Sequence, residues 1–79
     1  MSTNATLTVG LATAPKRVIT AQGVVIRYGY QPMGDTGYAK YMEHLFRRMP
    51  DKETLRSIVT SYNEANGINA VFDAAEYGL

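Results

Sequence analysis

The chain has 79 residues, of which 46% are hydrophobic and 19% are charged, with a formal net charge of +1. This composition is too apolar and too weakly charged for a disordered tail, and the absence of cysteine excludes disulfides, thiolate nucleophiles and zinc–cysteine sites. A chain of this length buries only about 60 to 65% of the surface that it exposes when unfolded, so we expect residues 1–79 to form one domain with a small core.

The first part of the chain, residues 5–31, is predicted to be a β structure. In residues 6–11, leucine and valine alternate with threonine and glycine, which is the pattern of a half-buried strand. Residues 17–30 are rich in β-branched residues and tyrosine, with a break at Gln22-Gly23, and indicate two more strands or one long bulged strand. We therefore expect an antiparallel β-hairpin or a three-stranded sheet with one packed face.

The second part, residues 35–77, is predicted to be helical. Apolar side chains fall at helical spacing between residues 37 and 49, while most charged side chains of this stretch lie away from that stripe. Pro50 then interrupts the helix, and Asp51 is a good N-terminal cap for a second one. The sequence thus predicts a helical hairpin over residues 37–65.

The C-terminal tail, residues 68–77, fits either a third short helix or a strand, and its alanine content favours the helix. Together these elements predict an α+β fold. It is a small two-layer domain in which the N-terminal antiparallel hairpin or three-stranded sheet packs against a C-terminal helical hairpin.

Charge is distributed unevenly along the chain. Residues 16–56 hold eight basic side chains against four acidic ones, a net charge of +4, whereas residues 57–79 hold three acidic side chains and no basic one, a net charge of −3. Such a bipolar surface can steer partners or pair with a second copy, and a homodimer is compatible with so small a core. The charge falls short of the concentrated positive field of a dedicated DNA-binding domain.

No group of residues predicts a catalytic, metal or cofactor site. His44 is the single histidine, and on the predicted helix it belongs to the polar face, where we expect it to be exposed to solvent. Asp35-Thr36-Gly37 resembles the catalytic tripeptide of aspartic proteases at those three residues only, and a helix cap explains it better. Because so small a domain has little room for a pocket of convergent groups, we do not expect an enzyme.

Tyrosines and arginines supply the candidate partner-binding residues. Exposed tyrosine beside arginine is typical of protein interfaces. Tyrosines occur near the end of the predicted sheet, and arginines flank them and recur in the predicted helical hairpin. The candidate residues are Arg27, Tyr28, Tyr30, Arg47, Arg48 and Arg56.

These features predict a small non-enzymatic protein-interaction module that binds a larger protein or protein complex. Compact proteins of this size without cysteine or motifs are common among phage-encoded factors, so we expect an inhibitor that blocks a surface of host defence or transcription machinery. The alternative is a nucleic-acid-binding regulator that uses the helix pair 37–65. With no secretion signal and no apolar stretch of about eighteen residues, we expect a cytoplasmic protein, in the host cytoplasm if phage-encoded, without a membrane partner.

Overall fold

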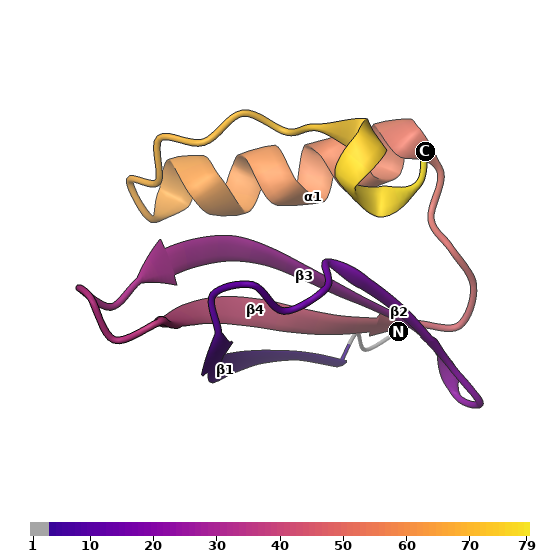
Figure 1. Cartoon of the computed structure of the whole chain (residues 1–79). Helices are drawn as coiled ribbons and strands as arrows, with labels where there is room; N and C mark the ends of the chain where they lie inside the picture. The colour runs from indigo at the N-terminus through magenta and orange to yellow at the C-terminus, as the bar shows by residue number, and fades with distance from the viewer. Residues whose placement is uncertain (1–3) are drawn as a thin grey trace.

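The computed structural model describes residues 4–79 and shows a four-stranded antiparallel sheet with one long helix on one face (Figure 1). A short 3₁₀ helix, η1, follows the long helix near the C-terminus. The elements in chain order are β1 (Asn4–Leu11), β2 (Arg17–Thr20), β3 (Gly23–Pro32), β4 (Tyr38–Phe46), α1 (Lys52–Ala65) and η1 (Ala74–Tyr77).

The strands lie in the order β1-β4-β3-β2, which is a Greek-key arrangement. Strands β2, β3 and β4 follow one another as hairpins, and β1 lies beside β4, so residues 12–16 must cross the sheet to reach β2. They cross on the face opposite α1, because the Arg27 Nη1 and the Tyr30 hydroxyl donate to the backbone oxygens of Pro15 and Ala14, at 2.7 and 3.1 Å. The sheet therefore has α1 on one face and this connection on the other.

Residues 38–46 form a strand, so the prediction of a helix over residues 37–49 is wrong. The apolar side chains at helical spacing come from both faces of β4: Met42 packs towards α1, whereas Tyr41 is buried on the opposite face. Because β4 has a covered face on each side, apolar residues occur on both, and the alternation that marks a half-buried strand is lost. The strand is stabilised by pairing with β3, its hairpin neighbour, and with β1, which is distant in sequence.

A bulge in β3 shifts its register against β4 between Tyr28 and Gln31. Gly29 adopts a positive φ of 70° there, and a side chain at this position would collide with the ring of Tyr62 on α1. The extra residue brings Tyr30 over Tyr41, on the face opposite α1, with 4.7 Å between the ring centroids. The bulge thus lets β3 contribute one tyrosine to each side of the sheet.

The core lies between α1 and strand β3. Val24, Ile26 and Tyr28 alternate along β3 and pack against Leu55 and Val59 of α1. These five side chains are buried, as expected for the facing sides of a sheet and an amphipathic helix. Phe72 and Tyr77 close one end of this core, and the Tyr77 hydroxyl donates to the backbone oxygen of Arg27 at 3.0 Å.

The predicted second helix is confirmed as α1. Asp51 caps it as expected, accepting a hydrogen bond of 2.7 Å from the backbone N–H of Thr54. The helical hairpin itself is wrong, because α1 has no helical partner before it among residues 4–79. The β part therefore extends to residue 46 instead of 31, and the helix-turn-helix geometry of the nucleic-acid interpretation is absent from this part of the chain.

The tail divides between two conformations. Residues 68–73 run back along α1 without regular structure, and Ala74–Tyr77 form the 3₁₀ helix η1. Asp73 caps η1, accepting from the backbone N–H of Ala75 at 3.1 Å, and Gly78 ends it with a positive φ of 72°. The predicted third helix thus exists only as a single 3₁₀ turn.

The core assignment can be tested with Leu55→Ala, since this side chain is fully buried between α1 and β3. The variant is expected to lower the free energy of unfolding by about 2 to 5 kcal/mol, because it removes buried methyl groups and leaves a cavity. Ser57→Ala, two residues along on the exposed side of α1, is the control and should change it by no more than about 0.5 kcal/mol. Equal denaturant midpoints for both variants would show that α1 does not pack on β3 in this way.

Candidate interaction surface

The outer edge of β1 is open along its length in the part of the chain that the structure describes. Within residues 4–79, β1 pairs with β4 on one side and with no strand on the other. The backbone N–H of Ala12 donates to the oxygen of Gly37 at 2.9 Å, so the even-numbered residues of β1 are those whose backbone groups hydrogen-bond to β4. Because backbone groups alternate in direction along an antiparallel strand, those of Leu7, Val9 and Leu11 point away from β4.

The same three residues carry the exposed apolar side chains of β1. Leu7, Val9 and Leu11 lie on the α1 side of the sheet, since Leu7 pairs with Met42, which packs against the core. Tyr38 of β4 pairs with Leu11 and continues the row. These four side chains, which we call the β1 stripe, are each between 49 and 57% exposed, because α1 lies over β3 and leaves β1 uncovered (Figure 1).

The two edges of the sheet differ in a way that singles out β1. Strand β2, at the other edge, has four residues, and Lys16 and Arg17 lie at its start. Short length and charge are common ways in which proteins prevent unwanted strand pairing. Strand β1 has eight residues, no charged side chain, no proline and no break in its register with β4. It therefore lacks each of these protections.

A polar network on the opposite face fixes the position of β1. The Thr8 hydroxyl donates to the Glu43 carboxylate on β4 at 3.3 Å, and Arg27 Nε on β3 donates to the same carboxylate at 2.7 Å. On this face the side chain of Tyr41 also fits against Gly10, where any larger residue would collide with its hydroxyl. Charge-assisted hydrogen bonds and close packing of this kind hold β1 in one register, so the open edge is presented by an ordered strand.

Three of the predicted partner-binding residues are engaged inside the protein. The Arg27 guanidinium forms an ion pair with Glu43 and donates a hydrogen bond to the backbone oxygen of Pro15. Tyr28 belongs to the core and is 4% exposed. Tyr30 is half-buried with its hydroxyl bonded to Ala14, and burial raises its pKa to about 12.

The other three predicted residues are exposed but lie apart from these. Arg47 and Arg48 follow β4 in the connection to α1. Arg56 is on α1, where it pairs with Glu53 at 3.1 Å and lies 5.8 Å from the centroid of the Phe72 ring. The six residues are thus spread over the core, the face opposite α1, the β4–α1 connection and α1. The structure does not gather them into one surface.

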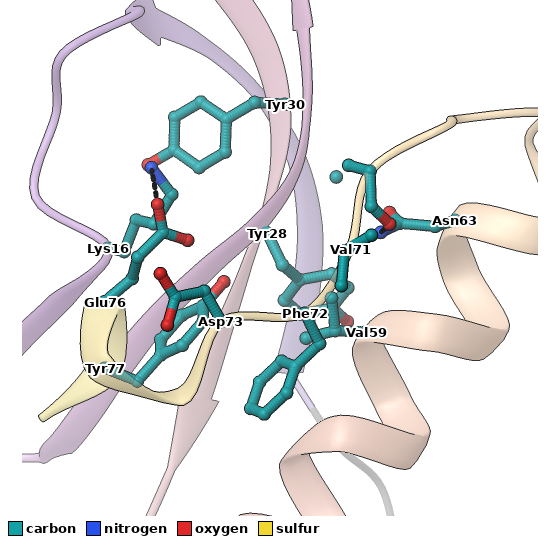
Figure 2. A pocket seen from close by; sticks show the side chains of 12 residues that line it. Lys16, Tyr28, Tyr30, Val59, Asn63, Val71, Phe72, Asp73, Glu76 and Tyr77 are labelled. Atoms are coloured by element: carbon teal, nitrogen blue, oxygen red, sulfur yellow. Dashed lines mark hydrogen bonds and ion pairs between the residues drawn. The ribbon is translucent and has the colours of Figure 1, made fainter. Parts of the chain in front are cut away.

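A cavity of about 260 Å³ lies between β3, the end of α1 and the tail (Figure 2). The Lys16 ammonium at its rim lies 4.5 Å from the Tyr30 ring centroid and 3.7 Å from the Glu76 carboxylate. Asn63 is buried at the other end, and its Nδ2 donates to the backbone oxygen of Ala70 at 3.3 Å, while its Oδ1 has no partner within the part of the chain that the structure describes. Since the charged groups satisfy one another or cap η1, we interpret this cavity as part of the attachment of the tail to the sheet.

His44 is buried, so the prediction of an exposed histidine is wrong. As β4 is a strand, His44 points towards α1, stacks on Phe46 with 4.1 Å between ring centroids, and has its Nδ1 3.2 Å from the Tyr28 hydroxyl. Its Nε2 is buried and has no hydrogen-bond partner among residues 4–79. Burial lowers the pKa of His44, because desolvation disfavours the charged ring.

Residues 4–79 contain no cluster of three or more histidine or acidic side chains that could hold a metal ion. In the same range no helix has the length and apolar character needed to cross a membrane. Comparison with known proteins finds no matching family model, no matching curated protein and no matching solved structure.

The burial of His44 predicts how stability depends on pH. Its pKa is 6.5 in the unfolded chain and lower in the folded protein, so below pH 6.5 the unfolded chain binds the proton more readily. The contribution of His44 to stability should be complete above pH 6.5 and should be lost as the pH falls towards the folded pKa. Thermal melts between about pH 7.5 and about pH 5 measure this loss.

His44→Phe is the matched variant, because phenylalanine keeps a ring against Phe46 and cannot titrate. Its melting temperature should vary less over this pH range than that of the original chain. If both proteins lose the same stability on acidification, another group is responsible and His44 is not buried in its neutral form.

Proposed function

We propose that this protein is a non-enzymatic protein-interaction module and that it binds through the edge of β1 together with the β1 stripe. The observation that carries this proposal is the coincidence of two features on the same residues. Leu7 and Val9 direct their backbone groups to the open edge, and their side chains are also more than half exposed. Unpaired backbone groups and exposed apolar surface are both stabilised when another strand pairs with this edge.

Strand addition is a recurrent mode of protein recognition. An extended segment of the partner hydrogen-bonds to the sheet edge, and alternate side chains of that segment pack on the exposed row. Because β1 has no charged residue, we expect the partner segment to be extended, apolar at alternate positions and free of charge at its centre. Binding of this kind requires no rearrangement of β1, which is already held by Glu43 and Tyr41.

The choice of a binding function over an enzymatic one is supported by the state of the reactive groups. His44 is buried against Tyr28 and Phe46, away from the open surface. The charged side chains at the cavity, Lys16 and Glu76, pair with each other. We therefore propose no catalytic role for these groups.

For the identity of the partner, we keep the expectation drawn from the sequence as a proposal. We propose a larger protein or complex, of which this chain covers one surface, as a phage-encoded inhibitor of host machinery would. Strand addition suits such a role, since a paired edge blocks whatever else uses the same strand. We propose no nucleic-acid-binding function for the helix pair 37–65, because the residues expected to form its first helix are strand β4.

The test is capture of partners from nuclease-treated lysate of the source cells, using the tagged chain and two charge variants. Val9→Lys places a cation in the β1 stripe and should reduce capture of the partner at least tenfold. Ile19→Lys makes the same kind of change on the same side of the sheet but at the β2 edge, where Ile19 is 72% exposed, and should leave capture unchanged. Both variants should melt close to the original chain because both sites are exposed.

Equal capture by the Val9→Lys variant and the original chain would remove β1 from the binding surface. Loss of capture in the Ile19→Lys variant alone would move the surface to β2. Recovery of only nucleic acid before nuclease treatment, and of no protein after it, would contradict the protein-binding function.

A further inference from the structure

We propose that a second copy of this chain occupies the β1 edge of the isolated protein, with the two β1 strands antiparallel about a two-fold axis at Thr8. The inference rests on the proposed function, since it uses the same edge and names one occupant for it. It joins the two four-stranded sheets into one continuous sheet. The β1 stripes of the two copies then lie next to each other between the two helices.

The backbone of β1 is complementary to itself in one register. The outward-facing residues are Ala5, Leu7, Val9 and Leu11, all at odd positions, because the even positions hydrogen-bond to β4. When Leu7 of one copy lies opposite Val9 of the other, Ala5 lies opposite Leu11 and every outward-facing residue has a partner. The oxygen of Leu11 is already used by the N–H of Ala14, at 3.0 Å, so the strongest pairing is at Leu7 and Val9.

Shifting this register by one pair of residues removes partners. If Val9 lies opposite Val9, Ala5 passes beyond the end of β1, since Leu11 is its last residue. If Leu7 lies opposite Leu7, Leu11 passes beyond Asn4, the first residue of the strand. The register centred on Thr8 is therefore the one that uses the whole described strand. It also places the two Thr8 side chains opposite each other, and threonine pairs of this kind are favourable in sheets.

Charge does not oppose this pairing. Strand β1 carries no charge, and the net charge of the chain is only +1. Among the side chains of residues 4–79, Lys40 on β4 lies beside Val9 and on the α1 side of the sheet. In the dimer two β1 strands separate the Lys40 of one copy from the other, a distance of at least about 14 Å at strand spacing, which is beyond the Debye length of about 8 Å at physiological salt.

Apolar surface favours the second copy over an unpaired edge. In the Thr8-centred register, Leu7 lies beside Val9 of the other copy at the spacing of neighbouring strands, about 4.8 Å. The β1 stripe of each copy then covers one side of the β1 stripe of the other. Because small domains bury little of their surface by themselves, such pairing adds apolar burial that a 79-residue chain lacks.

A disulfide test reports both the dimer and its register. The chain contains no cysteine, so Thr8→Cys introduces a single thiol at the axis. Non-hydrogen-bonded antiparallel pairs have Cα atoms about 4.5 Å apart, within the range that a disulfide bridges. Under mild oxidation the Thr8→Cys variant should form a covalent dimer on a non-reducing gel, with at least a tenfold excess over the control.

Thr6→Cys is the matched control, because it lies on the same face of the same strand. Residue 6 of each copy lies opposite Gly10 of the other, so the two new thiols are about 13 Å apart and cannot bridge. Failure of Thr8→Cys to cross-link would overturn the proposal, and preferential cross-linking of Thr6→Cys would overturn the register. Circular dichroism of both reduced variants checks that β1 still folds onto β4.

Sedimentation of the unmodified chain over a range of concentrations separates this proposal from the proposed function. A dimer that Val9→Pro converts to monomer supports it, since proline removes an outward-facing N–H and leaves the β1–β4 ladder intact. A chain that is monomeric at every concentration contradicts the second copy as occupant. If Val9→Lys still abolishes partner capture in that case, the proposed function holds without the dimer.

Discussion

Strand β4 pairs on both sides, with β1 along one edge and with β3 along the other, and the rest of the structure depends on this placement. With β4 in the second position, β1 becomes an edge strand and β3 becomes the strand under α1. The connection from β1 to β2 then crosses the face opposite the helix, where its backbone accepts hydrogen bonds from Arg27 and Tyr30. The position of one strand thus decides which residues are core and which are surface.

The width of the single helix explains why β1 stays uncovered. An α-helix with its side chains is about 10 Å across, which is roughly the width of two strands spaced 4.8 Å apart. Helix α1 and the returning tail cover β3 and the adjoining side of β4, where Val24, Ile26 and Tyr28 are buried. The apolar residues of β1 lie on the same side of the sheet but beyond the reach of the helix. A sheet of four strands with one helix therefore leaves an apolar strip that another chain can cover.

Local signals in the sequence correctly predicted the elements that have one covered face or a clear capping residue. The alternation of Leu7, Val9 and Leu11 predicted a strand, and Asp51 predicted the start of α1, and both are confirmed. Strand β4 was missed because its two faces are both partly covered, and its apolar residues fall by coincidence at helical spacing. The error on β4 placed His44 on a solvent-exposed helix face, whereas the strand turns it into the core.

The candidate surface was harder to predict than the fold. Sequence reasoning selected arginine and tyrosine, yet Tyr28 fills the core and Arg27 is held by Glu43. Leu7, Val9 and Leu11 of the β1 stripe were predicted to form one face of a half-buried strand, because alternation does not report whether a helix lies above that face. The sequence does show that β1 is a long strand without charge or proline. This feature indicates a pairing surface only when the strand is known to lie at the edge of the sheet.

The most direct measurement is amide hydrogen exchange along β1, followed by NMR at a concentration where the chain is a monomer. We expect an alternating pattern: the amides of Leu7 and Val9 exchange fast, because they point to solvent, and those of Thr8 and Gly10 exchange slowly, because they bond to β4. Slow exchange at Leu7 and Val9 in the monomer would show that the edge is already covered. That result would contradict the claim that β1 presents an open edge to a partner.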